Sequence, residues 1–191
     1  GGRGTIALEV MIPVPHVLIM GGGHCGEAIA GLLDRMAWPY SVHDTREHFS
    51  SIELYPRAAE CITSSVSELM ASENENTLSR FSDILLLGHD WSEDQERLLS
   101  LLGIFNDAGH QLDGSEAPRV GVIGSRSKWQ SFEQQALGEG IPQNLLDQVI
   151  CPIGINIGAE SPEEIAVAVV AQILSAHKGV LPDQPTWRQR S

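Results

Sequence analysis

The sequence predicts a single α/β domain built on a doubly wound parallel sheet of the Rossmann type. Short apolar runs of strand length alternate with helical patterns along most of the chain, which is typical of such sheets. Residues 84–87 are continuously apolar, as expected of a strand buried on both faces. A glycine-rich turn at residues 21–26, Gly-Gly-Gly-His-Cys-Gly, stands directly between a predicted strand and a predicted helix.

The first predicted unit is a strand, a helix and a second strand within residues 16–44. The apolar run at residues 16–20 leads into the glycine turn, and residues 27–36 carry apolar side chains at helical spacing. Trp38 and Pro39 close this helix, and the second strand ends at Asp44. The unit is therefore a βαβ module.

The middle of the chain is predicted to supply two further strands. A third strand is expected near residues 58–63, followed by a short helical turn at residues 64–69 and an exposed connection at residues 71–80. The fourth strand, residues 83–87, precedes a helix for which Ser92 is a plausible N-cap.

The C-terminal part is predicted to hold one strand and one long helix. Residues 107–118 are polar and indicate a surface excursion, and residues 119–123 form the fifth strand. A capping box with proline at the first helical position, residues 161–164, starts a helix expected over residues 165–177.

A length of 191 residues fits one domain, which we expect to span residues 16–178. Residues 1–15 form an N-terminal segment whose apolar part is either an extra strand or the remnant of a preceding small domain. Residues 179–191 are expected to be a loose C-terminal tail.

The composition disfavours several classes of protein. There are 25 acidic and 12 basic residues, a formal net charge of −13, whereas a nucleic-acid surface requires a basic footprint. No apolar run approaches the ~20 residues that cross a bilayer, and the start shows no signal-peptide pattern. Cys25, Cys61 and Cys151 are odd in number and far apart, which resembles neither a disulfide framework nor a structural zinc set. We therefore expect a soluble, cytoplasmic protein without a metal site.

The glycine turn predicts a site for a phosphorylated ligand. Gly21 permits a tight turn out of the strand, Gly23 lets backbone approach a phosphate, and Gly26 lets the helix pack closely on the sheet. Unpaired amides at the helix start present donors and a partial positive charge, so the whole turn, Gly22 included, is assigned to cofactor binding. The alternative is that the glycines only relieve backbone strain at a strand–helix corner.

Two side chains of the turn are also candidate cofactor-binding residues. His24 occupies a variable position, from which it either contacts the ligand or lies idle at the surface. Cys25 is either a small apolar filler against the sheet or, if accessible, a thiol whose pKa the helix start lowers.

Three further corners are expected to meet the glycine turn beyond the carboxyl ends of the strands, where such sheets bind ligands. Asp44 lies close to the ~20-residue offset of the ribose-binding carboxylate of dinucleotide folds. His89 and Asp90 follow the fourth strand, and the imidazole can serve as a donor, a metal ligand or an acid–base group. The fifth strand is followed by a glycine, a serine and two cations that can clamp a phosphate or carboxylate: Gly124, Ser125, Arg126 and Lys128.

Together these motifs resemble the Rossmann domain of the XdhC/CoxI family, accessory factors for the maturation of xanthine dehydrogenase and carbon monoxide dehydrogenase. Four motifs join the glycine turn in carrying the resemblance: residues 42–47 (Val-His-Asp-Thr-Arg-Glu), 88–90 (Gly-His-Asp), 121–126 (Gly-Val-Ile-Gly-Ser-Arg) and 151–166 (Cys-Pro-Ile-Gly-Ile-Asn-Ile-Gly-Ala-Glu-Ser-Pro-Glu-Glu-Ile-Ala). The last two are more specific than the glycine turn, and the similarity extends to about residue 177.

The resemblance implies a protein that binds molybdenum cofactor (molybdopterin) and helps to deliver it, in sulfurated form, to a molybdenum hydroxylase apo-enzyme. The glycine turn and the corner at residues 124–126 would then face the phosphate or nucleotide part of the cofactor. The resemblance also favours a cofactor-insertion protein over an enzyme, and we expect a homodimer. Because the family usually has a small domain ahead of this one, the chain is either a fragment or a stand-alone form. The excursion at residues 107–118 also looks longer than the usual connection.

Two rival functions stay open. An NAD(P)-dependent oxidoreductase would use the same glycine turn, but it needs a hydride-acceptor site and usually a substrate domain, for which little chain remains. Neither Tyr40 nor Tyr55 is followed four residues later by lysine, so the catalytic pair of one large dehydrogenase class is absent. A nucleotide-sensing regulatory domain without catalysis is the second rival.

Overall fold

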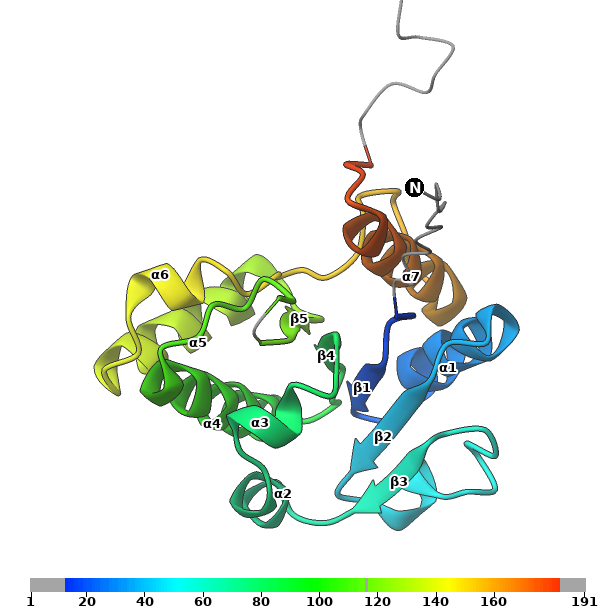
Figure 1. Ribbon diagram of the computed structural model, residues 1–191, viewed down its shortest axis with the longest axis horizontal. Helices are drawn as coiled ribbons and strands as arrows, with labels where there is room; N and C mark the ends of the chain where they lie inside the picture. The colour runs from blue at the N-terminus through cyan, green and yellow to red at the C-terminus, as the bar shows by residue number, and fades with distance from the viewer. Residues whose placement is uncertain (1–12, 116, 183–191) are drawn as a thin grey trace, which may run out of the picture.

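The computed structural model describes residues 13–115 and 117–182 as a five-stranded parallel sheet with helices on both faces (Figure 1). The predicted doubly wound, Rossmann-like fold is confirmed. Most of the expected N-terminal segment (residues 1–12) and of the C-terminal tail (residues 183–191) lies outside the described residues.

The sheet reverses its strand order between β1 and β4. The strands β1 (Val17–Met20), β2 (Tyr40–Asp44), β3 (Glu60–Thr63), β4 (Asp83–Leu86) and β5 (Arg119–Val122) are arranged β3-β2-β1-β4-β5. In this register Met20 is paired with His43 on one side and with Leu86 on the other. The segments that follow β1, β2 and β4 therefore leave the sheet side by side, at the switch point where such folds bind ligands.

Each face of the sheet carries its own set of helices (Figure 1). The helices α1 (His24–Met36) and α7 (Pro162–Lys178) cover one face, and α4 (Trp91–Ala108), α5 (Arg126–Gly138) and α6 (Gln143–Leu146) lie on the other. Along β1, Val17 and Ile19 pack into the core under α1 and α7, whereas Leu18 and Met20 pack into the opposite core. Because it is covered on both sides, β1 is buried throughout.

The connections contain more structure than the sequence predicts. The 3-10 helix η1 (Glu47–Ser50) follows β2 where no helix was predicted, whereas α2 (Val66–Ser72) confirms the helical turn expected at residues 64–69. The expected exposed connection at residues 71–80 is partly wrong, since it contains α3 (Glu75–Leu78), whose Leu78 is fully buried. The expected surface excursion at residues 107–118 is also partly wrong, since Leu112 and Ala117 pack into the core.

The starts of the two long helices differ in how well they were predicted. Ser161 accepts from the amide of Glu164 in a capping box, as expected. Ser92 does not cap α4. The carboxylate of Asp90 does so, accepting from the amide of Ser92 at 2.8 Å and from that of Glu93 at 3.4 Å. An aspartate in extended backbone just before a helix is as good a cap as serine, so the pattern alone did not choose between them.

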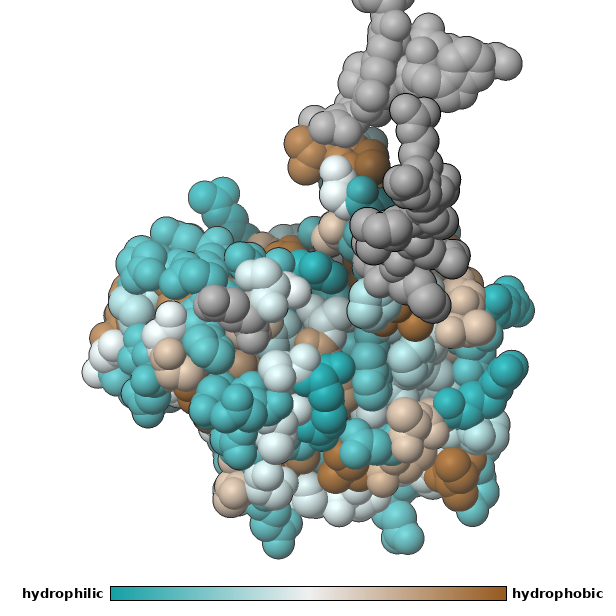
Figure 2. Space-filling view, in the orientation of Figure 1, coloured by the Kyte–Doolittle hydropathy of each residue, from teal (hydrophilic) through white to brown (hydrophobic). Residues whose placement is uncertain are grey.

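The surface shows no large apolar area on the face drawn in Figure 2, where hydrophilic side chains dominate and apolar ones form separate spots. Exposed large apolar side chains belong to different elements; they include Ile52, Leu137, Ile157 and Val167. Among the helices of the described residues, none has both the length and the apolar character to cross a membrane.

Candidate functional site

The glycine turn brings the end of β1 against the end of β4. Gly21 has a φ of +112°, and a Cβ there would lie 2.6 Å from the amide nitrogen of Gly88. A Cβ on Gly26 would lie 2.6 Å from the carbonyl oxygen of Gly21, so α1 packs tightly on the turn. Only glycine fits at either position, in agreement with the turning and packing roles predicted for them.

Gly23 is the N-cap of α1 and faces open space. No side chain caps this helix start, and a Cβ on Gly23 would meet no heavy atom within 4 Å. The amides of the first helical turn, which includes His24 and Cys25, have no intrahelical acceptor. An uncapped helix start of this kind can bind an anion.

Gly22 closes the turn through bonds to the rest of the protein. Its amide donates to Oδ2 of Asp44 at 2.9 Å, and its carbonyl accepts from the Tyr55 hydroxyl at 2.6 Å. A Cβ on Gly22 would overlap the carbonyl oxygen of Phe49. Its backbone polar groups are thus engaged within the protein, although the sequence predicts a ligand contact.

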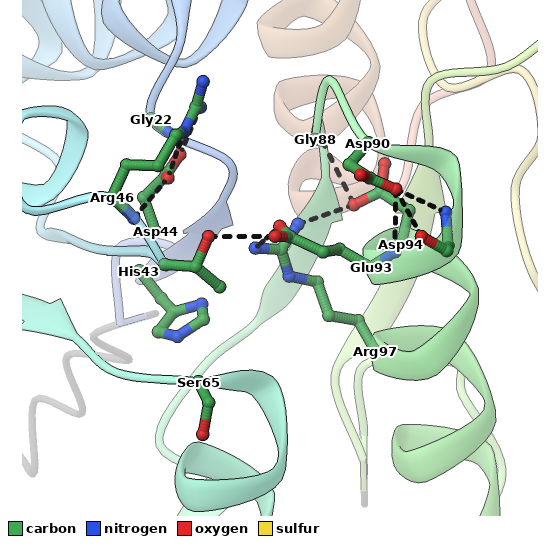
Figure 3. Close-up of polar contacts among 12 residues, drawn as sticks. Gly22, His43, Asp44, Arg46, Ser65, Gly88, Asp90, Glu93, Asp94 and Arg97 are labelled. Carbon is green, nitrogen blue, oxygen red and sulfur yellow. Dashed lines mark hydrogen bonds and ion pairs between the residues drawn. The ribbon is translucent and has the colours of Figure 1, made fainter.

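Asp44, predicted to hold a ribose hydroxyl, is buried and accepts four hydrogen bonds (Figure 3). Oδ1 accepts from the amide and Nε of Arg46 at 3.0 and 2.8 Å, and Oδ2 accepts from the amide of Gly22 and from Nη2 of Arg46, both at 2.9 Å. Burial by itself would raise the pKa of Asp44, but these hydrogen bonds outweigh it and hold the pKa below its usual value. The carboxylate therefore anchors the loop after β2.

Arg46 is a site residue that the sequence interpretation missed. Its guanidinium forms a two-point pair with Asp44, lies 4.0 Å from the ring centroid of Phe49, and lines a cavity at the sheet edge. The hydrogen bonds to Asp44 raise the pKa of Arg46 above its ordinary value. The available signal was an arginine two residues after the acid that ends β2.

His24 and Cys25 lie where α1 begins, and both line the same cavity as Arg46. His24 is exposed and Cys25 is partly buried. Burial, together with the charge of Glu163, raises the pKa of Cys25. The direction of this pKa shift favours the small apolar filler over the thiol with a lowered pKa.

A network of charged side chains holds the end of β4 (Figure 3). The amide of Gly88 donates to Oδ1 of Asp94 at 3.2 Å, and the same oxygen accepts from Nη1 of Arg97 at 2.8 Å. Nη2 of Arg97 donates to Oε2 of Glu93 at 3.2 Å, and Oε1 of Glu93 accepts from the Thr45 hydroxyl at 3.0 Å. The network thus joins the loop after β2 to the loop after β4 across the end of β1.

The two site residues predicted after β4, His89 and Asp90, have different roles in the structure. His89 is exposed and lines the cavity beside the glycine turn. Asp90 is exposed too, but its carboxylate caps α4. Hydrogen bonds from the side chain and amide of Ser92 lower the pKa of Asp90.

Of the two cations predicted after β5, one lines a cavity and the other does not. The Ser125 hydroxyl caps α5 by accepting from the amide of Lys128 at 3.4 Å. Nζ of Lys128 lies 4.7 Å from the ring centroid of Trp91, and Lys128 lines a second cavity. Arg126 is exposed at the first position of α5 and lines neither cavity.

Two cavities lie along the carboxyl edge of the sheet. The first, here the β2-side cavity, has a volume of about 390 Å³. It is lined by Gly23, His24, Cys25, Arg46, Phe49, Leu87, Gly88, His89, Ile123 and Pro162. The second, the β5-side cavity, has a volume of about 490 Å³. It is lined by Gly88, Ile123, Gly124, Ser125, Lys128, Ile165, Ala168 and residues 152–159. Gly88 and Ile123 line both cavities, which therefore adjoin, and we refer to the two together as the trough.

Residues 152–159 form a wall of the trough that the sequence interpretation did not assign to the site. The amide of Ile153 donates to a carbonyl of β5 at 3.0 Å, and the amide of Gly154 donates to Oε1 of Gln172 at 2.6 Å. Gly154 and Gly158 have φ values of +113° and +73°. Two glycines four residues apart, before the capping box of α7, were the available signal for a shaped loop.

The trough gathers predicted residues from three of the four corners. Those that line it are Gly23, His24, Cys25, His89, Gly124, Ser125 and Lys128. Gly21, Gly22 and Gly26 shape the turn beneath it. Asp44, Asp90 and Arg126 lie outside its lining.

Another hollow of about 530 Å³ runs along α1 and α7 from the starts of both helices. It is lined by helix side chains such as Leu32, Arg35 and Val167, and it shares His24 and Pro162 with the trough. Within residues 13–115 and 117–182, no group of three or more His, Cys, Asp or Glu side chains is placed to hold a metal ion.

A parallel sheet with reversed strand order, helices on both faces and a glycine turn at its switch point defines a Rossmann-type domain. Residues 17–173 match the family model described as the XdhC Rossmann domain. The chain belongs to the XdhC family.

Three relatives illustrate the similarity. The chain is 27% identical over 176 residues to an uncharacterized protein, YqeB, of Escherichia coli K12, covering 91% of this chain and 29% of that protein. It is 26% identical over 168 residues to a protein of Bacillus subtilis 168 described as a probable xanthine dehydrogenase subunit, covering 88% of this chain and 44% of that one. A crystal structure of a protein described as a xanthine dehydrogenase from Bacillus halodurans superposes with a TM-score of 0.70 at 23% identity, covering 87% of this chain and 45% of that one. The chain therefore spans less than half the length of these relatives, and the structural likeness supports the fold.

Proposed function

We propose that this chain is the cofactor-handling domain of an accessory factor for a molybdenum hydroxylase. In this proposal it binds molybdenum cofactor, or a related nucleotide, in the trough and assists delivery to an enzyme such as xanthine or carbon monoxide dehydrogenase. Membership of the XdhC family and the name of the Bacillus subtilis relative support a role connected with xanthine dehydrogenase. The trough at the switch point of the sheet is the observation that carries the proposal.

The lining of the trough fits a ligand with a phosphate at one end and a polar ring system at the other. The open amides at the start of α1 suit the phosphate. The β5-side cavity, at about 490 Å³, lies within the roughly 300–1,000 Å³ range of small-molecule sites. Ser125, Asn156 and the backbone of residues 154–158 can hydrogen-bond a heterocycle there. The cofactor would bring the molybdenum chemistry, and the residues of the trough would bind and orient it.

Because the chain is acidic, binding of an anion depends on the hydrogen-bond donors and cations that line the trough. With a formal net charge of −13, the protein as a whole repels anions, so an anionic cofactor must be held by local amides and a few cations. Lys128 is such a cation, since it lines the β5-side cavity and its ammonium contacts the Trp91 ring.

We predict that Lys128→Gln weakens binding of molybdenum cofactor about tenfold, which corresponds to about 1.4 kcal/mol. Arg126→Gln is the matched control, because it removes an equal charge from the same helix start but outside the trough. Isothermal titration calorimetry of the chain with molybdenum cofactor measures both. Equal losses in the two variants, or pyridine nucleotide binding far tighter than cofactor binding, would contradict the proposal.

The oxidoreductase alternative has less support from this site. The carboxylate expected to hold the ribose of a pyridine nucleotide is buried and engaged by Arg46. Turnover of NADH or NADPH with small carbonyl compounds is the observation that would favour this alternative.

A further inference from the structure

The β2-side cavity differs from a ribose-binding corner in the kind of hydrogen-bonding group that it offers. A ribose diol is recognised by a carboxylate acceptor at the end of the second strand. Here that acceptor is Asp44, which is 1% exposed and does not line the cavity. The polar groups that do line it include the guanidinium of Arg46, the His89 imidazole and the open amides at the start of α1.

Asp44 has no capacity left for a ligand hydroxyl. An ionised carboxylate offers about four lone-pair sites. In Asp44, two sites on Oδ1 are filled by the amide and Nε of Arg46, and two on Oδ2 by the amide of Gly22 and Nη2 of Arg46. A diol would have to displace one of these donors: either the Gly22 amide, which is buried and would cost about 1–3 kcal/mol without a partner, or a donor of Arg46, which would break the pair.

Arg46 keeps donors available while its position is fixed. Nε and Nη2 are bound to Asp44, and the guanidinium carbon lies over the Phe49 ring. Among the described residues, Nη1 has no hydrogen-bond acceptor, and the Arg46 side chain is 35% exposed. The charge of Arg46 is balanced by Asp44, so its contribution is directional N–H groups held in place before a ligand arrives.

We propose that the β2-side cavity is a subsite for a phosphate monoester and rejects an unphosphorylated ribose diol. The phosphate oxygens, which are acceptors, would lie between Nη1 of Arg46 and the open amides of α1. This inference rests on the proposed function, because it concerns one end of the same trough. It makes Arg46 the specificity-determining residue of the trough.

NADP⁺ and NAD⁺ are suitable probes, because they differ only in one phosphate monoester on a ribose. By isothermal titration calorimetry we expect NADP⁺ to bind this chain at least about tenfold more tightly than NAD⁺. Arg46→Gln should bring the ratio close to one, and Arg46→Lys should also lower it because the fork of donors is lost. Thermal melting followed by circular dichroism shows which of the two Arg46 variants is folded. One folded variant is enough for the comparison of NADP⁺ with NAD⁺.

Asp44→Asn separates this inference from ordinary ribose recognition. If the carboxylate were a ligand acceptor, this change would weaken NAD⁺ binding about tenfold or more. Our inference instead expects the loss to fall mainly on NADP⁺, because Arg46 loses the partner that holds its guanidinium in place. Equal affinities for the two nucleotides in the unmodified chain, or a preference that survives both Arg46 variants, would overturn the inference.

The same samples titrated with molybdenum cofactor keep the two claims apart. Loss of cofactor binding with the NADP⁺ preference intact would defeat the proposed function alone. Tight cofactor binding without any NADP⁺ preference would defeat the phosphate subsite alone. Absence of both kinds of binding would defeat both.

Discussion

The sequence predicts where single residues lie at the sheet edge, but it does not predict their hydrogen-bond partners. The offset of Asp44 from the glycine turn predicted its place at the end of β2, which is confirmed. Its pairing with Arg46 depends on the backbone path into η1, which carries no periodic signal. His43 is similar: the apolar run predicted a strand there, but not a fully buried imidazole whose Nε2 lies 3.1 Å from the carbonyl oxygen of Ser64.

These two residues predict that the free energy of unfolding falls as the pH is lowered. Burial and the charge of Arg97 lower the pKa of His43 from 6.5, so its contribution is present above that value and is lost progressively below it. The pKa of Asp44 lies below 3.8 in the folded state, because its hydrogen bonds outweigh the effect of burial. Its contribution is therefore present above that value and disappears as the pH falls through the folded pKa.

Urea denaturation between about pH 7.5 and pH 3 measures this dependence. We expect His43→Gln to flatten the upper part of the curve and Asp44→Asn to flatten the acidic end. Curves that keep the slope of the unmodified chain in both variants would show that other groups are responsible.

At the scale of elements, regular sequence patterns predicted the strands and helix starts, whereas the irregular loops could not be predicted. Continuous apolar runs located β1 and β4, and the capping box located the start of α7. The loop at residues 152–159 was missed as part of the site because its shape rests on two glycines with positive φ and on side-chain bonds from α7. Such a loop has no period from which its position could be predicted.

The glycine turn gives a matched pair of predictions. Gly22→Ala would place a methyl group on the carbonyl oxygen of Phe49, and we expect it to destabilise the chain by about 1–3 kcal/mol or more. Gly23→Ala meets no neighbouring atom, so its effect on stability should stay below about 1 kcal/mol.

Because Gly23 lines the β2-side cavity, the same methyl group should weaken ligand binding there. Chemical denaturation and cofactor titration of the two variants test this separation. Equal stabilities for Gly22→Ala and the unmodified chain would show that the loop after β2 can move to accommodate the methyl group.

For the whole molecule, the alternation of strands and helices predicted the topology, because parallel strands place their carboxyl ends at one edge. It did not predict which side chains meet across that edge. Thr45 and Glu93 are 48 positions apart, and their hydrogen bond completes the network from Gly88 to the loop after β2. This network ties the loop after β2 to the end of β4 and the start of α4.

Amide hydrogen exchange with and without molybdenum cofactor tests most directly whether one ligand occupies the whole trough. We predict slower exchange on binding at residues 23–25 and also at residues 156–159, which belong to opposite ends of the trough, with no change in α6. Exchange that is unchanged at both ends, or slowed only in the hollow between α1 and α7, would contradict the account.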